Sequence, residues 1–298
     1  MLLINGFQLN FEDYIAELAT RALLYEVSTT PKPGLVDRIS SGAHKDMNFF
    51  TFLDSTCSLI PFWREFTCLG MAYSSNDFEY LFLKAREIGQ RAEKSMFFAT
   101  NNINTQKGAI FCIGLLCVSA GYIDSHSGMQ TTVDELLQFC GKLSSYSLSD
   151  FDKISSYGTK LTNGEKLFLK HGETGIRGEA SRGFPNVHQH SLPVLKSFVK
   201  KGAPLNDAAV AALLHLIVYV DDTNMFTRAP LDLCSSIKLE IEQFLSTDPT
   251  PVQVLKKASS LEPVFVNNNV SIGGCADLLA ITYFLYFWET SRILRNEE

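Results

Sequence analysis

Apolar residues recur along most of the chain at the three- and four-residue spacing of amphipathic helices. Within residues 11–25 this spacing aligns five side chains on one stripe: Tyr14, Ile15, Leu18, Ala22 and Tyr25. Asn10 stands where a helix N-cap is expected, and Asp13 falls in the first turn. The segment therefore predicts a helix with one buried face.

The same spacing predicts further helices along the rest of the chain. Their expected bounds are 49–69, 77–98, 106–121, 132–143, 163–170, 188–201, 207–220, 231–246, 251–258 and 273–295. Several of the starts resemble capping boxes, in which a cap residue is followed three positions later by glutamate: Asn76 with Glu79, Thr132 with Glu135, and Thr162 with Glu165.

Strand-type alternation is scarce, and no βαβ rhythm occurs. Two late segments, "DAAVAALLHLIVYV" and "CADLLAITYFLYFW", are apolar nearly all round, which is typical of central helices covered by other helices. No linker or repeat divides the chain. The sequence predicts a single all-α domain, residues 1–298, with two central apolar helices.

Composition and charge narrow the class of protein. The 298 residues, 46% of them hydrophobic, are enough to bury one large core. The net charge of −6 argues against a general polyanion binder, so nucleic acid is not an expected partner.

The N-terminus has no basic region of a signal peptide, and the apolar run 275–288 is shorter than the roughly 20 residues that cross a bilayer. The seven cysteines form no CxxC pair, and their odd number does not suggest a disulfide framework. We therefore expect a cytoplasmic protein with no membrane partner.

The polar information lies in the breaks between the predicted helices. The first break, "EVSTTPKPGLVDRISSGAHKDM" (residues 26–47), leaves helical conformation at two prolines and Gly34. Asp37, His44 and Asp46 follow, and carboxylate oxygens suit Mg²⁺. An ordinary loop with solvated charges explains the spacing equally well.

The second break, "NNINTQKGAIFCIGLL" (residues 101–116), opens a helix. Asn104 and Thr105 can cap it, and Lys107 stands in the first turn, where free N–H groups and a lysine favour an anion. It is not a phosphate-binding P-loop, which needs GxxxxGK followed by serine or threonine. Alone, the pattern is more typical of a capped buried helix with one exposed lysine.

The third break, "HGETGIRGEASRGFP" (residues 171–185), combines four glycines with Glu173, Arg177, Glu179 and Arg182. Glycines let the backbone approach a ligand closely, and one arginine side chain can bind two phosphate oxygens at once. A flexible loop is the alternative, but the length and the paired charges favour a binding role.

The fourth break, "DDTNMFTR" (residues 221–228), directly follows the most apolar helix. Asp221, Asp222 and Asn224 bring three oxygen donors to the end of a buried helix, where charges are costly unless paired or bound to metal. Mg²⁺ commonly takes one or two carboxylates together with substrate phosphates. A helix end in solvent is the alternative, and we favour the metal.

The fifth break, "NNNVSIGGCADLLA" (residues 267–280), places Ser271 and the pair Gly273–Gly274 before a helix that contains Asp277. A phosphate cradle and a glycine-lined helix start that packs closely are both consistent with it. By contrast, the two histidines of "VHQH" (His188 and His190) lack a third zinc ligand at a known spacing. His215 fits a buried core position.

Taken in order, these blocks resemble the triphosphoribosyl-dephospho-CoA synthase family. The resemblance rests on "EVSTTPKPGLVDR…GAHKDM", "NTQKGAIF", "GIRGEASRGFP", "DDTN…R" and "GGCADLLA", which run from Glu26 to Ala280. Three positions depart from the family pattern: Ser40 replaces asparagine, Gln106 replaces histidine in "NTHKG", and Ile272 replaces proline in "SPGG". The resemblance therefore carries no proton-transfer role to Gln106.

The resemblance implies an enzyme with two substrates, ATP and 3'-dephospho-CoA. The ribose 2'-hydroxyl of dephospho-CoA attacks C1' of the ATP ribose, and adenine leaves. The product is the precursor of the prosthetic group of citrate lyase or malonate decarboxylase, and a separate holo-acyl-carrier-protein synthase attaches it. The implied cofactor is Mg²⁺, which positions the triphosphate.

Roles follow for the residues of the five breaks. We expect acid–base or orienting roles for Glu179, His44 and Asp37, the last of these alternatively as a metal ligand. The expected Mg²⁺ ligands are Asp221, Asp222, Asp46 and Asn224. The expected substrate-binding residues are Lys32, Lys107, Arg177, Arg182, Arg228, Asn104, Ser271, Gly273 and Gly274.

Two other functions fit an all-α fold with paired aspartates. One is a Mg²⁺-dependent hydrolase of N-glycosidic or ADP-ribosyl bonds, which would release adenine without an acceptor. The other is a non-catalytic nucleotide-binding protein. The sequence does not distinguish the citrate lyase from the malonate decarboxylase pathway.

Overall fold

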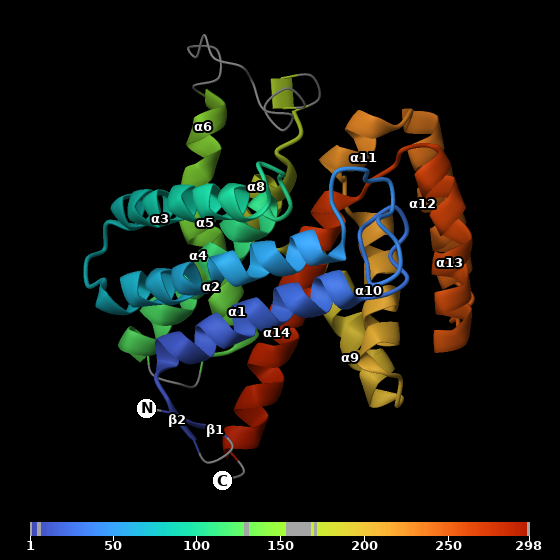
Figure 1. Ribbon diagram of the computed structural model, residues 1–298. Coiled ribbons are helices and arrows are strands. Elements are labelled where there is room, and N and C mark those ends of the chain that lie inside the picture. The colour runs from blue at the N-terminus through green and yellow to red at the C-terminus, as the bar shows by residue number, and fades with distance from the viewer. Residues whose placement is uncertain (1, 5–6, 128–130, 153–167, 170–171, 297–298) are drawn as a thin grey trace.

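The computed structural model describes residues 2–4, 7–127, 131–152, 168–169 and 172–296. Helices dominate this part of the chain, which confirms the predicted all-α class (Figure 1). One small exception lies at the N-terminus, where β1 (Leu2–Ile4) and β2 (Phe7–Leu9) pair as an antiparallel hairpin.

The helices follow one another with short connections. They are α1 (Phe11–Ser28), α2 (Phe49–Ala72), α3 (Phe78–Ala99), α4 (Lys107–Ser127), α5 (Val133–Ser145), α6 (Ser149–Asp152), α8 (Gly175–Ser181), α9 (Leu192–Lys200), α10 (Leu205–Tyr219), α11 (Thr223–Arg228), α12 (Leu231–Leu245), α13 (Pro251–Asn267) and α14 (Gly273–Asn296). A 3₁₀ turn, η1 (Tyr146–Leu148), precedes α6, and a π-helical turn, η3 (Val187–Ser191), precedes α9.

Most predicted helices are present, with differences at their ends. The helix expected at 251–258 runs on to Asn267, through Pro263. The segment expected at 188–201 begins as the π turn η3, in which Leu192 N–H donates to Val187. Pro193 follows and has no N–H with which to continue an α-type ladder. The predicted helix at 163–170, with its cap Thr162 and Glu165, falls almost wholly outside the described residues.

The helix caps were predicted in part. The box of Thr132 and Glu135 is confirmed, with both reciprocal hydrogen bonds formed. The cap predicted at Asn76 is wrong, because Asp77 is the N-cap of α3 and accepts the N–H of Tyr80 at 3.0 Å. Asn10 occupies the N-cap position of α1, but its side chain makes no capping bond.

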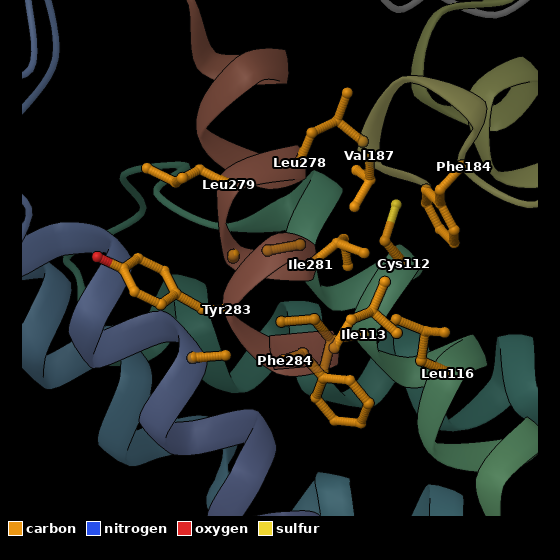
Figure 2. Packing of buried hydrophobic residues seen from close by; sticks show 14 of the residues in the cluster. Cys112, Ile113, Leu116, Phe184, Val187, Leu278, Leu279, Ile281, Tyr283 and Phe284 are labelled. Carbon is orange, nitrogen blue, oxygen red and sulfur yellow. The ribbon is translucent and has the colours of Figure 1, made fainter. Parts of the chain in front are cut away.

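The two helices predicted to be central are α10 and α14. The helix α14 crosses the molecule beside α1 and α4, and α10 lies among α9, α12, α13 and α14 (Figure 1). Ile281 and Phe284 of α14 lie near Ile113 and Leu116 of α4, and Leu278 lies beside Val187 (Figure 2). This apolar centre holds the polar start of α14 in place.

A third apolar helix, α4, also lies inside the molecule. Within the described residues, the segment Lys107–His126 is the one helix long and apolar enough to cross a membrane, and 72% of its apolar window is buried in the protein. That burial is typical of a core helix.

Glycines allow α2 and α4 to pack closely. A Cβ at Gly70 would lie 2.1 Å from the carbonyl oxygen of Val118, and one at Gly121 would lie 2.2 Å from that of Thr67. Both approaches are to backbone, which does not give way as a flexible side chain does. The separation of α2 from α4 therefore depends on these two glycines.

We expect Gly70→Ala to destabilise the fold by about 1–3 kcal/mol, because the added methyl group forces α2 and α4 apart. Gly89→Ala is the matched control: the nearest atom to its added Cβ lies 3.9 Å away, and alanine in an open helix position stabilises by about 0.5–1 kcal/mol. Urea unfolding midpoints measure both. Equal effects of the two substitutions would contradict the packing argument.

Candidate functional site

A cavity of about 600 Å³ opens where the five polar breaks meet. Its wall comes from the end of α1 and the loop after it, the starts of α4 and α14, α8, and the junction between α10 and α11. The size is within the range of small-molecule sites. Segments more than 250 residues apart in sequence, from Leu23 to Ala280, thus line one cavity.

All but one of the predicted site residues line this cavity. They are Lys32, His44, Asp46, Asn104, Lys107, Arg177, Glu179, Arg182, Asp221, Asp222, Asn224, Arg228, Ser271, Gly273 and Gly274.

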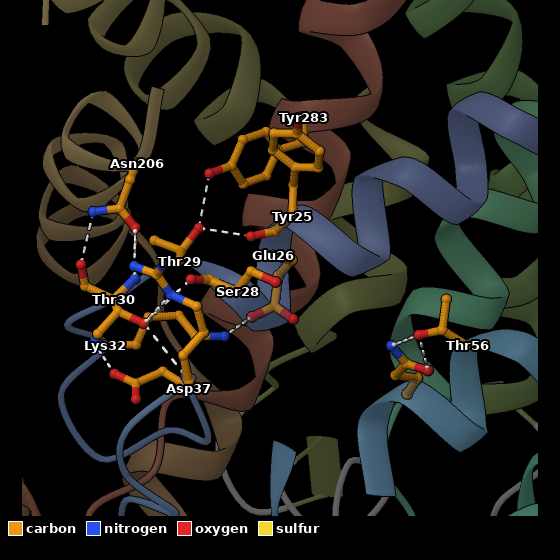
Figure 3. A network of polar contacts seen from close by, with 12 residues as sticks. Tyr25, Glu26, Ser28, Thr29, Thr30, Lys32, Asp37, Thr56, Asn206 and Tyr283 are labelled. Atoms are coloured by element: carbon orange, nitrogen blue, oxygen red, sulfur yellow. Dashed lines mark hydrogen bonds and ion pairs between the residues drawn. The ribbon is translucent and has the colours of Figure 1, made fainter. Parts of the chain in front are cut away.

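Asp37 is the exception, and its expected catalytic or metal role does not match its position. It is buried in its own loop, where one carboxylate oxygen accepts the N–H groups of Ile39 at 2.7 Å and Ser40 at 2.8 Å. The other oxygen accepts the N–H of Lys32 at 3.1 Å (Figure 3). Asp37 therefore shapes the loop that carries Lys32.

The same loop is held from outside by Glu262 of α13. Its carboxylate accepts the N–H of Gly34 at 2.8 Å and the hydroxyl of Ser40 at 2.6 Å. Gly34 has φ of +72°, and a Cβ there would lie 2.4 Å from the carbonyl oxygen of Val270, so glycine is required at this turn. Ser40, which departs from the family pattern, is thus one of the two residues through which Glu262 holds the loop.

Behind the loop lies a buried ion pair of Glu26 and Lys32 (Figure 3). Both side chains line the cavity, yet both residues are less than 5% exposed. Burial raises the pKa of Glu26, and the neighbouring Lys32 acts in the opposite direction. Lys32 therefore has a carboxylate partner already, and Glu26 is a site residue that the sequence analysis did not assign.

Asp222 joins two helix starts. One oxygen caps α11 by accepting the N–H groups of Asn224 at 2.8 Å and Met225 at 3.3 Å. The other accepts the N–H of Cys275 in the first turn of α14 at 2.8 Å. Burial raises the pKa of Asp222, although these backbone donors lower it.

The pair Gly273–Gly274 makes room for this arrangement. A Cβ at Gly273 would lie 3.0 Å from Asn224 Nδ2, and one at Gly274 would lie 3.0 Å from Asp222 Oδ2. The positive end of α14 thus faces a carboxylate of the protein. Close packing, one of the two alternatives drawn from the sequence, accounts for both glycines.

Asp277 is a second acidic residue that was not assigned to the site. It lines the cavity against the start of α4, where a Cβ at Gly108 would lie 1.9 Å from Asp277 Oδ2. Burial, with the negative charges of Glu26 and Asp222, raises its pKa well above the usual value. Glu26, Asp222 and Asp277 therefore bring three carboxyl groups to the wall that also holds the buried Lys32.

Glu179 is buried on α8 and has a raised pKa, chiefly because of burial. Its carboxylate accepts the N–H of Asn186 at 2.8 Å and the Asn186 side-chain amide at 3.0 Å. A fixed carboxylate with a raised pKa suits a general base near neutral pH.

His44 contacts the start of α14. Its Nε2 lies 3.0 Å from the hydroxyl of Ser271, and its Nδ1 lies 3.8 Å from a carboxylate oxygen of Asp46. Burial and then the charge of Arg228 lower the pKa of His44, with Asp46 opposing them. The neutral imidazole that results has one N–H to donate.

The predicted phosphate-binding cations differ in whether a carboxylate already pairs with them. Lys107 pairs with Glu93 at 2.9 Å, Arg177 with Asp150 at 3.0 Å, and Arg182 with Glu179 at 3.5 Å.

Arg228 lines the cavity, is exposed, and has no carboxylate partner among the residues that the structure describes. It is therefore the cation that an incoming phosphate meets without displacing a partner. Lys107, Arg177 and Arg182 would each have to share or exchange a carboxylate.

The four predicted Mg²⁺ ligands do not form a ready-made metal site. Across the described ranges, no group of three or more histidine, cysteine, aspartate or glutamate side chains is placed to hold an ion. Asp221 is 61% exposed and pairs with Lys238 at 3.0 Å, and Asp46 is also 61% exposed. Asp222 and Asn224 are the two that lie together, against Gly273 and Gly274.

Gln106, where the family pattern has histidine, is buried beside α2. It accepts the hydroxyl of Ser55 at 2.6 Å, and its amide donates to Thr56 at 3.1 Å. These contacts tie the start of α4 to α2. Asn104 acts within its own segment, where its side-chain oxygen accepts the N–H of Lys107, the first residue of α4, at 3.3 Å.

Comparison with known proteins is consistent with this geometry. A family model described as ATP:dephospho-CoA triphosphoribosyl transferase matches residues 12–295. The chain is 36% identical over 286 residues to a probable 2-(5''-triphosphoribosyl)-3'-dephosphocoenzyme-A synthase of Streptococcus mutans, covering 92% of this chain and 96% of the relative. A Streptococcus pyogenes protein of the same description is 35% identical over 285 residues, with the same coverage. No solved structure matches.

We expect Asp277→Asn to stabilise the protein at neutral pH. A carboxyl whose pKa is raised by folding stabilises fully only below its unfolded pKa, near 3.8, and this contribution is lost as the pH rises through the folded pKa. Asparagine does not titrate, so the gain should be largest at neutral pH and should shrink as the pH falls towards the unfolded pKa.

Thermal unfolding between about pH 4 and pH 8 measures this difference. Asp54→Asn, an exposed carboxylate on α2, is the control and should change little at any pH. A gain that is the same at acid and neutral pH would contradict the assignment of Asp277.

Proposed function

The chain belongs to the ATP:dephospho-CoA triphosphoribosyl transferase family, and on this premise we propose that its cavity transfers the triphosphoribosyl group of ATP to 3'-dephospho-CoA. The chain is thus a transferase. The observation that carries the specific reaction is the cavity wall, where Glu179, a buried carboxylate with a raised pKa, and Arg228, a cation with no carboxylate partner in the described part of the chain, line the same space.

The proposed reaction forms a glycosidic bond. The 2'-oxygen of dephospho-CoA bonds to C1' of the ATP ribose, the bond from C1' to the adenine nitrogen breaks, and adenine leaves with the electron pair and gains one proton, which balances the one lost by the 2'-hydroxyl. Glu179 takes the proton of the 2'-hydroxyl. A hydrogen-bond donor, for which His44 is the candidate, stabilises the departing adenine.

Positive charge develops on the ribose as adenine leaves. Nearby carboxylates stabilise such an oxocarbenium-like state, as they do in glycoside cleavage. Asp222 and Asp277 are the carboxylates proposed for this role, because both line the cavity, and positive charge that forms beside them favours their ionised forms. Their stabilising effect would be greatest at the moment when the positive charge forms.

The triphosphate carries negative charge and needs cations that already line the cavity. Arg228 is proposed as its first contact, and Lys107 and Arg177 lie in the same wall. Arginine suits this task because its guanidinium binds two phosphate oxygens at once.

Mg²⁺ is proposed to enter with ATP. The described residues offer no three-ligand site, but Mg²⁺ needs only one or two carboxylates when phosphates and water complete its shell. Asp222 and Asn224 fit this demand from the protein side, and Asp221 would do so if it exchanged Lys238. When bound, the ion would position and neutralise the triphosphate.

The product is proposed to pass to a holo-acyl-carrier-protein synthase, as the family resemblance implies, for citrate lyase or malonate decarboxylase. The proposed compartment is the cytoplasm. The seven cysteines are all free, and five of them are buried, which suits a reducing environment.

We expect adenine release from ATP only when dephospho-CoA and Mg²⁺ are both present. Mass spectrometry should then show a product equal to dephospho-CoA plus the triphosphoribosyl group. Chelating Mg²⁺ should abolish both signals. Adenine released without dephospho-CoA would favour the hydrolase, and nucleotide binding without any product would favour a binding protein.

We expect Glu179→Gln to lower kcat by about 10²–10⁴, the usual contribution of a general base, with little change in KM. In the wild type, kcat should rise with pH through the raised pKa of Glu179, because the base acts only when ionised. Glu242→Gln, on the exposed face of α12, is the control. Normal turnover by Glu179→Gln would place the base elsewhere.

A further inference from the structure

An aromatic stack stands at the edge of the cavity, built from residues that the proposed reaction does not use. Tyr219, the last residue of α10, lines the cavity and is 44% exposed. The imidazole of His190 lies against one face of its ring, with centroids 3.7 Å apart and planes within 8°. The remaining exposure of Tyr219 leaves ring surface open to a ligand.

The local structure explains why His190 reaches this position. The π turn η3 shifts the register of the chain before α9, and η3 packs against α10. Such turns often occur at functional sites. The histidine pair of "VHQH", which resembles no zinc motif, therefore has another role: His190 backs an aromatic ring.

The stack is uncharged near neutral pH. Burial lowers the pKa of His190, and burial together with His190 lowers the pKa of His215, one turn before Tyr219 on α10, to about 4. Neutral rings stack without the cost of desolvating a cation. The hydroxyl of Tyr219 makes no hydrogen bond within the described part of the chain, so what the residue offers to a ligand is its ring.

Neither of the two phenylalanines in the cavity wall offers an equivalent surface. Phe151 is buried and stacks with Phe168 at 4.4 Å. Phe52 is half-buried and has no ring stacked behind it among the described residues. Tyr219 is also followed directly by Val220, Asp221 and Asp222, all of which line the cavity, so a nucleotide whose base lies on its ring would place its ribose hydroxyls close to carboxylates that can accept hydrogen bonds.

We propose that Tyr219, backed by His190, is the stacking platform for the adenine ring of a nucleotide substrate. The inference rests on the proposed function in one respect, because that function supplies two adenine-bearing substrates, ATP and dephospho-CoA. Stacking on an aromatic ring recognises the flat base in either of them. The platform would therefore set affinity for a nucleotide and leave the phosphate contacts to the cations.

Calorimetric titration tests this with three ligands used singly: ATP, dephospho-CoA and inorganic triphosphate. We expect Tyr219→Ala to weaken one or both nucleotides by about tenfold or more, the usual scale of a base stacked on an aromatic ring. The nucleotide whose affinity falls is the one whose adenine stacks on Tyr219. Inorganic triphosphate, which has no base, should bind with unchanged affinity.

Two further variants separate the ring from its surroundings. Tyr219→Phe keeps the aromatic face and should bind the nucleotides within about twofold of wild type, whereas His190→Ala removes the backing ring and should give a smaller loss than Tyr219→Ala. Unchanged nucleotide affinity in Tyr219→Ala would overturn the proposal, and so would an equal loss in Tyr219→Phe or a parallel loss of triphosphate binding. A wild-type protein that forms no triphosphoribosyl product, but still shows this binding pattern, would overturn the proposed reaction and not the platform.

Discussion

The carboxylate of Asp222 is the interaction on which the rest of the site depends. It accepts backbone N–H groups from the start of α11 and from the start of α14, and so fixes two chain segments that are 50 residues apart. Asn224 and Arg228 follow on one side, and Ser271 with its partner His44 lies on the other. A buried carboxylate with three backbone donors is a rigid joint, because each lost bond would leave a polar group unsatisfied in the interior.

Around this joint, the site gathers carboxyl groups. Glu26, Asp222 and Asp277 line the same cavity with Lys32 as their buried cation, and all three carboxyl groups have raised pKa values. Such a wall is unfavourable while it is empty and becomes favourable when positive charge arrives or forms within it. The arrangement therefore suits a reaction in which a sugar carbon becomes positive.

The sequence predicted the helices and the polar breaks between them, because both follow from patterns local to the chain. The spacing of apolar residues defines a helix wherever one face is buried, and polar residues gather at helix ends when a rigid scaffold carries a site. The partners of individual charges are set by the fold and were not predictable. Lys32 looked available for phosphate, yet it is paired with Glu26 in the interior.

Three other residues show the same limit. Asp277 looked like a single acidic residue on an apolar helix, and only the absence of a Cβ at Gly108 reveals the space made for it. Asp37 resembled a ligand but accepts hydrogen bonds from its own loop, a local use of aspartate that competes with any function. Tyr219 gave no signal at all, because its role depends on a π turn 29 residues earlier in the chain.

Glu262 supports the site although it lies outside the cavity wall. It lies on α13, at the periphery of the molecule (Figure 1), and does not line the cavity, yet it bonds both to Gly34 and to Ser40 in the loop that carries Lys32 and His44. The helix α13 is therefore a structural support for the chemistry performed some distance away. A substitution in α13 can therefore change the position of this loop. It would alter the kinetics of the enzyme although every residue that touches substrate stays the same.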